Sequence, residues 1–120
     1  MSVLRSLSCV FAFLLAGGNL LHAAEPALTP VQVAYLNAET RKANEQFAAR
    51  VAQITGTTPA AISKLMPPEG RIADPAVRVI STLEAQRKET LPDEMKAQIN
   101  AAERDRRAAI ASAREAAKNK

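Results

Sequence analysis

The chain has 120 residues and a formal net charge of +4, which suits one small domain and does not by itself identify a partner. Its single cysteine, Cys9, and its single histidine, His22, both lie within the first 24 residues. Once that segment is removed, disulfides, thiol nucleophiles, Ser-His triads and the usual zinc or copper ligand sets are excluded. We therefore expect no cofactor, no metal and no enzymatic activity.

Residues 1–24 have the order of a secretory signal peptide, with Arg5 first, an apolar run over residues 7–16, and small residues at Ala23 and Ala24. A membrane anchor needs about 20 mostly apolar residues, and this run is roughly half as long. Cleavage is expected after Ala23 or Ala24. The protein would then be periplasmic or secreted, with residues 25–120 forming a single helical domain and no stable membrane insertion after cleavage.

Two helices are predicted in the first half of that domain. Thr29 and Gln32 form a capping box around Pro30, and an apolar stripe runs from there to Gly56. Thr58 begins a second, short helix, which ends at the loop of residues 67–75. The expected inward residues are Val33, Leu36, Ala43, Phe47, Val51 and Ile54 in the first helix, and Ile62, Leu65 and Met66 in the second.

Two more helices follow. Asp74 with Pro75 predicts a third helix that runs toward Thr90, and Pro92 opens a fourth. Past Ala102 the inward stripe is almost all alanine, so we expect this end to project, fray or meet a partner. The inward residues are Val77, Val79, Ile80 and Leu83, then Met95, Ile99, Ala102, Ala109 or Ile110, and Ala113.

No window alternates apolar and polar residues with a period of two. The predicted fold class is therefore all-α, a small bundle of about four helices, two long and two short, after an N-terminal signal peptide.

The stretch VAQITGTTPAAISKLM, residues 51–66, resembles the helix-turn-helix motif of LacI-type repressors. Gly56 takes the place of the turn glycine. The resemblance implies that Thr58 and Ser63 face base edges and that Lys64 contacts a phosphate.

Two features disfavour nucleic acid as the partner. Thr55 and Thr57 stand where apolar residues are usual around the turn glycine, and an exported protein does not meet chromosomal operators. A compact helical hairpin explains the same pattern. A small DNA-binding regulator remains an alternative function.

The segment LTPVQ, with Leu28, Thr29 and Gln32, resembles the LTxxQ motif of the Spy/CpxP family of periplasmic helical proteins. A degenerate second copy begins at Leu91, with Pro92 in place of the threonine and Met95 in place of the glutamine. The resemblance implies a chaperone or envelope-stress role. A capping box preceded by a hydrophobic residue explains the same three residues.

The last helix carries a surplus of basic residues that could contact an acidic partner. The acidic neighbours Asp93/Glu94 and Glu103/Asp105 are expected to be solvated charges rather than an acid–base pair. The possible partner-contact residues are Arg104, Arg106, Arg107, Arg114 and Lys118.

These features predict a secreted or periplasmic, non-enzymatic helical binding protein, chaperone-like or related to envelope stress. Its partner would be another protein, a client, or a second copy of itself. Two alternatives stay open: the DNA-binding regulator, and a self-assembling structural envelope protein.

Overall fold

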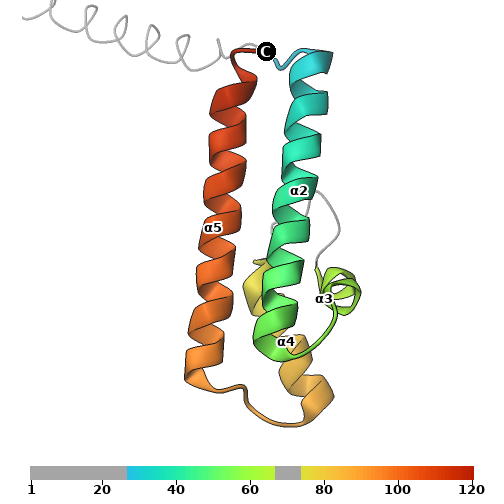
Figure 1. Ribbon diagram of the computed structural model, residues 1–120, viewed down its shortest axis with the longest axis vertical. Helices are drawn as coiled ribbons and strands as arrows, with labels where there is room; N and C mark the ends of the chain where they lie inside the picture. The colour runs from blue at the N-terminus through green and yellow to red at the C-terminus, as the bar shows by residue number, and fades with distance from the viewer. Residues whose placement is uncertain (1–26, 67–73) are drawn as a thin grey trace, which may run out of the picture.

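Four helices make up the part of the chain that the computed structural model describes, residues 27–66 and 74–120, and this part has no strand. They are α2 (Pro30–Thr55), α3 (Pro59–Leu65), α4 (Pro75–Arg87) and α5 (Asp93–Ala117) (Figure 1). The predicted all-α bundle with two long and two short helices is confirmed. The predicted signal peptide and residues 67–73 of the predicted loop lie outside the described residues.

Three of the helices begin with the side-chain caps that the sequence predicts. The Thr29 Oγ1 accepts a hydrogen bond from the Gln32 N–H at 3.2 Å, and the Gln32 side chain accepts from the Thr29 N–H at 2.9 Å. Thr58 accepts from the Ala61 N–H, and Asp74 accepts from the Ala76 N–H at 2.9 Å. Each cap satisfies an N–H group that has no partner within its helix.

Both α2 and α4 end at a residue in the left-handed backbone conformation, and only the one after α2 is a glycine. Gly56 has φ 71° and donates its N–H to the Ala52 carbonyl, as expected for a helix C-terminus. Lys88 has φ 56° and donates to the Glu84 carbonyl, so α4 stops at Arg87 instead of reaching Thr90. The sequence shows no glycine there to mark the end.

The two long helices lie side by side and antiparallel, and α3 and α4 pack against only one half of this pair (Figure 1). We call this the closed half, residues 43–55 of α2 and 93–106 of α5. Nearly all of the core lies between this half, α3, α4 and the turn before α5. The buried core residues are Phe47, Ala48, Val51, Ala52, Ile62, Ala76, Val79, Leu83, Leu91, Ile99 and Ala102.

The remainder of the long pair, residues 30–42 of α2 and 107–117 of α5, is called the open half. Its buried residues on α5 are alanines, Ala113 and Ala117, which face α2. Alanine side chains let two helices approach closely but remove little apolar area from water. The C-terminal half of α5 therefore pairs with α2, and the two extend together beyond α3 and α4 (Figure 1).

Two of the residues expected to face inward are exposed. Val33 is 40% exposed and Val77 is 61% exposed. Val33 lies in the open half, where neither α3 nor α4 covers it, and Val77 lies in the first turn of α4. Of the two alternatives in α5, Ile110 is half-buried and Ala109 is exposed.

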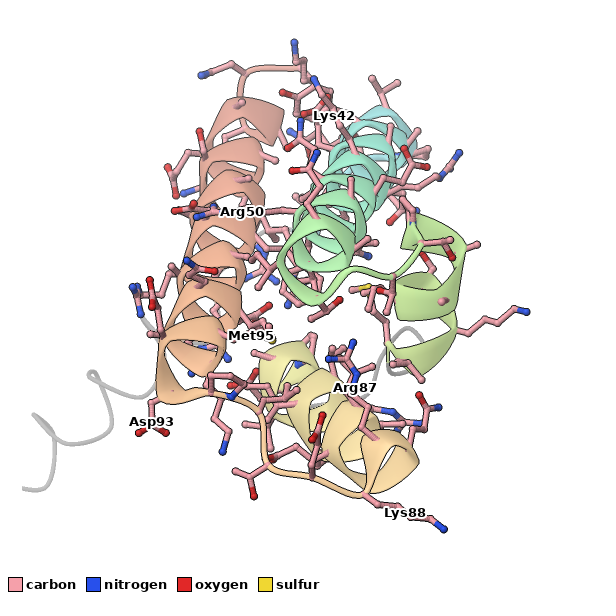
Figure 2. All side chains as sticks on the ribbon, turned by 60° about the horizontal axis from the view of Figure 1, so that its bottom comes forward. Lys42, Arg50, Arg87, Lys88, Asp93 and Met95 are labelled. Atoms are coloured by element: carbon pink, nitrogen blue, oxygen red, sulfur yellow. The ribbon has the colours of Figure 1, made fainter. Side chains whose placement is uncertain are left out.

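The turn between α4 and α5 is held by Glu84. Its Oε2 accepts a hydrogen bond from the Leu91 N–H at 2.9 Å and forms an ion pair with the Lys96 Nζ at 3.2 Å. Lys88 and Asp93 lie at the two ends of the same turn, where α4 stops and α5 begins (Figure 2). The bond from Leu91 lowers the pKa of Glu84 from its usual 4.5, and Lys96 acts in the same direction against partial desolvation.

This contact predicts an acid-sensitive part of the stability. Because the pKa of Glu84 is lowered by folding, its contribution is complete above the unfolded value of 4.5 and is lost as the pH falls through the folded pKa. Glu84→Gln should therefore lower the free energy of unfolding at neutral pH, and the difference from wild type should shrink in acid. Urea unfolding across a pH series measures it, with the exposed Glu89→Gln as the control. A pH-independent difference would contradict the assignment.

Candidate functional site

A groove between α2 and α5 in the open half is the best candidate for a binding site. Its volume is about 440 Å³. The groove lies on the same side of the long pair as α4. This follows from Arg107, which lines the end of the groove nearest the closed half and also pairs with Asp74, the residue before α4. The lining residues of this open groove are Leu36, Thr40, Arg106, Arg107, Ile110, Ala111 and Arg114.

The apolar part of the open groove comes from both helices. Leu36 and Ile110 are half-buried, and Ala111 is exposed. Val33 lies one turn before Leu36, and residues three or four apart share one face of a helix. Val33 therefore extends the same apolar stripe toward the N-terminus of α2. The stripe is apolar surface that the described part of the chain leaves in contact with solvent.

The lower end of the groove is fixed by a buried carboxylate. Glu103 is only 3% exposed and accepts hydrogen bonds from two arginines. The Arg106 Nε lies 2.7 Å from Oε2, and the Arg107 Nε lies 2.8 Å from Oε1. The expectation that Glu103 is a solvated charge is therefore wrong. A buried carboxylate is tolerated because its oxygens receive charge-assisted hydrogen bonds.

The two arginines connect Glu103 to the other helices. Arg106 Nη1 donates to the Asn44 side chain on α2 at 3.0 Å, and Arg107 Nη2 donates to Asp74 at the start of α4 at 3.1 Å. The bond to Glu103, with the charges of Glu103 and Asp74, raises the pKa of Arg107 above its ordinary value. This network joins α2, α4 and α5 where the closed half meets the open half.

The predicted partner-contact residues therefore differ in what they can do. Arg106 points inward and is held by Glu103 and Asn44. The other four are exposed, and their spacings of three, seven and four place them on one side of α5. Lys118 pairs with Glu115 of its own helix. The cationic ridge beside the open groove consists of Arg104, Arg107, Arg114 and Lys118.

Sequence reasoning missed Glu103 and Asn44 as positioning residues. The signal was present in part, because Glu103 lies beside Ala102 in the inward stripe and precedes arginines at three and four residues. Such pairs usually form on the exposed face of a helix. Only the position of α4 shows that this one is buried.

The residues of the LTxxQ resemblance lie near the end of the open half. Thr29 and Gln32 bond to each other as a capping box, and Leu28 is exposed. Tyr35, two turns further along α2, carries the Lys120 ammonium 4.6 Å from its ring centroid. The capping box stabilises the N-terminus of α2, and the cation–π contact holds Lys120 beside the first turns of the same helix.

The helix-turn-helix residues lie at the opposite end of the pair. Thr58 caps α3, and Ser63 and Lys64 are exposed, but α3 is only 7 residues long. Thr55 donates to the Val51 carbonyl at 2.8 Å and lies 2.9 Å from the Thr57 hydroxyl. These bonds explain how two threonines are accommodated where the motif usually has apolar residues.

Arg87 adds a further bond at this corner. Its Nη2 donates to the Thr55 carbonyl at 2.7 Å, and Figure 2 shows its side chain between α4 and the end of α2. The corner is therefore fixed to α4 as well as to α3. A hollow of about 390 Å³ separates α3 from Leu83 and Gln86 of α4.

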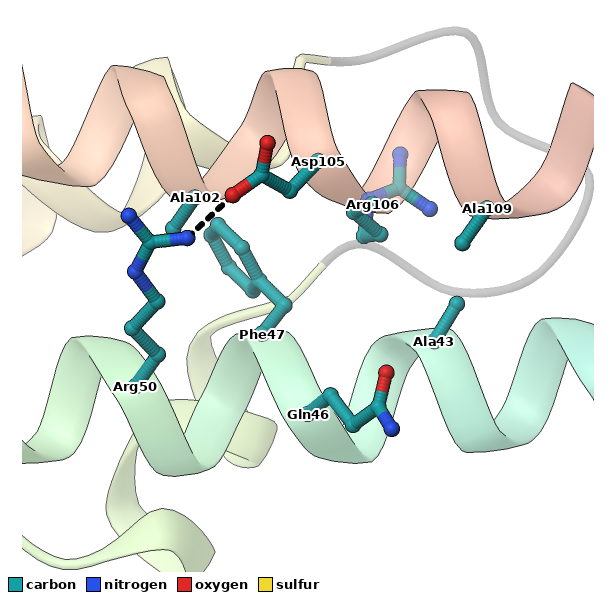
Figure 3. Close-up of a pocket in the computed structure, with 8 residues that line it drawn as sticks. All are labelled: Ala43, Gln46, Phe47, Arg50, Ala102, Asp105, Arg106 and Ala109. Carbon is teal, nitrogen blue, oxygen red and sulfur yellow. Dashed lines mark hydrogen bonds and ion pairs between the residues drawn. The ribbon is translucent and has the colours of Figure 1, made fainter.

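A smaller hollow of about 210 Å³ lies on the other side of the long pair (Figure 3). Phe47 packs at its floor toward Ala102, and Arg50 bonds to Asp105 across its rim. Arg50 and Asp105 are both largely exposed, with side chains 47% and 72% accessible. The rim of this hollow is occupied by the Arg50–Asp105 pair, and its lining lacks the leucine and isoleucine of the open groove.

The described residues hold no group of three or more cysteine, histidine or acidic side chains placed to bind a metal ion. Across residues 27–66 and 74–120, no helix combines the length and the apolar character needed to cross a membrane. Comparisons of the chain with protein-family models, with curated proteins and with solved structures found no match.

The contrast between buried and exposed ion pairs yields a stability prediction. Arg106→Ala removes one of the two arginines on buried Glu103 and should lower the free energy of unfolding by on the order of 3 kcal/mol. Arg50→Ala breaks an exposed pair between the same two helices and should cost less than about 1 kcal/mol. Urea unfolding followed by far-UV circular dichroism measures both. Equal costs would show that Glu103 does not organise the junction.

Proposed function

We propose that the protein is a secreted or periplasmic, non-enzymatic helical binding protein with chaperone-like activity toward other proteins. The observation that carries the proposal is the open groove, an apolar stripe bordered by exposed cations. It is present because the packed core extends along only one half of the long helix pair. Such a surface suits a protein segment that is apolar on one side and acidic on the other.

The charges around the groove support binding rather than catalysis. The acidic groups near it, Glu103 and Asp74, are both engaged with Arg107. General acid–base chemistry needs a titratable group with its proton available to a substrate. Export rests on the leader sequence of residues 1–24.

The DNA-binding alternative has one feature in its favour, the α2–Gly56–α3 corner with Lys64 exposed. The cationic ridge, however, lies on α5 and beside the open groove, away from that corner. A regulator would therefore have to read DNA through Thr58 and Ser63 without the help of this ridge. The third alternative, a self-assembling envelope protein, would use the open groove for a second copy.

Cell fractionation with mass spectrometry of the mature N-terminus separates export from operator binding. The proposal predicts a periplasmic or secreted species that begins at Ala24 or Glu25. A cytoplasmic protein that keeps residues 1–24 would contradict it and favour the regulator.

The binding activity is tested by aggregation of reduced insulin, followed by light scattering. The exported protein should suppress scattering at roughly stoichiometric ratios, since one groove engages one chain. The reductant leaves residues 25–120 unaffected, because they contain no cysteine. Lysozyme, another small basic protein, is the control for charge alone. No suppression beyond that of the control would refute the chaperone-like activity.

A further inference from the structure

We propose that the open groove binds an acidic amphipathic helix of about three turns, which lies on the long pair as a continuation of the layer formed by α4. The inference rests on the proposed binding function and names its partner class. It follows from the length of the uncovered surface, its apolar stripe and the charges along its edge.

The length follows from where α4 begins. The bond from Arg107 to Asp74 marks the first residue before α4, so the surface beyond Arg107 is uncovered by that helix. From Arg107 to Lys118, α5 advances by about 16 Å, at about 1.5 Å per residue. A partner helix of roughly three turns covers this distance.

The apolar stripe favours a helix over an extended chain. Leu36 of α2 and Ile110 of α5 line the groove, and Val33 lies one turn from Leu36 on the same face of α2. A packed helix presents apolar residues with the repeat that separates Val33 and Leu36. An extended peptide needs a sheet edge for its backbone hydrogen bonds, and no strand occurs in residues 27–66 and 74–120.

The charges specify an acidic partner. Arg107 lines the groove and uses Nε and Nη2 for Glu103 and Asp74, which leaves Nη1 without a hydrogen-bond partner among the described residues. Arg114 lines the groove and makes no hydrogen bond or ion pair with the described residues. Lys118 pairs with the exposed Glu115, a weak contact that a partner carboxylate can replace. Carboxylates one turn apart on a partner helix would meet this ridge.

The chain offers matched controls for each part of the argument. Arg114→Glu reverses a charge in the groove, and Lys42→Glu makes the same change on an exposed residue that lines the opposite side of the pair. Val33→Ser removes a valine from the stripe. Val31→Ser changes a valine that is 66% exposed and only two positions away, and it therefore points to the other side of α2.

The probe is a fluorescent peptide of about 15 residues, long enough to form a helix, with leucines on one face and glutamates beside them. Two further peptides keep its composition in scrambled order or replace each glutamate by lysine. Fluorescence anisotropy should show binding of the first peptide only. Arg114→Glu and Val33→Ser should each weaken it by roughly tenfold, and both control variants should leave it unchanged.

Equal binding of the scrambled or the lysine peptide would overturn the inference, as would equal loss in the control variants. So would binding of anionic vesicles or duplex DNA that is stronger than peptide binding and is lost with Arg114→Glu. Thermal unfolding of each variant confirms that it is folded. If wild-type protein suppresses insulin aggregation but binds no peptide, only this inference falls. If it does not suppress aggregation, the proposed function falls as well.

Discussion

The carboxylate of Glu103 is the constraint on which the arrangement of the helices depends. It is buried at the point where α2, α4 and α5 meet, and Arg106 and Arg107 must both remain there to compensate its charge. Because Arg106 also holds Asn44 and Arg107 also holds Asp74, the same charge sets the position of α5 against α2 and the start of α4. Below this junction the bundle has a core of large apolar residues, and above it the long helices are joined mainly through alanines.

That division explains why part of the face of the long pair stays exposed. A 26-residue and a 25-residue helix are much longer than the 13-residue α4, so α4 cannot cover the face of the pair along its whole length. Val33, Leu36 and Ile110 lie on the part that α4 does not cover and remain at least partly accessible, and the arginine that anchors α4 also lines the groove. One residue, Arg107, therefore serves both the fold and the proposed site.

The local structure could be predicted from the sequence better than the site. Thr29, Thr58 and Asp74 are followed by prolines and act through nearby backbone groups, so their caps follow from the sequence. The end of α4 at Lys88 was missed because a lysine adopts the left-handed conformation there. The burial of Glu103 and the exposure of Val33 depend on where α4 lies, which is a tertiary property. Helical periodicity indicates a face, but not which part of that face is covered.

The central claim is that the long pair has a closed half with a packed core and an open half with a face that α3 and α4 do not cover. Native-state amide hydrogen exchange of α5 tests it most directly, because protection reports local opening free energies. The account predicts stronger protection for residues 97–106 than for residues 107–116 in the isolated protein, and a gain confined to residues 107–116 when the acidic helical peptide binds. Equal protection along α5 without a partner would contradict the account, since it would show that the face of the open half is already covered.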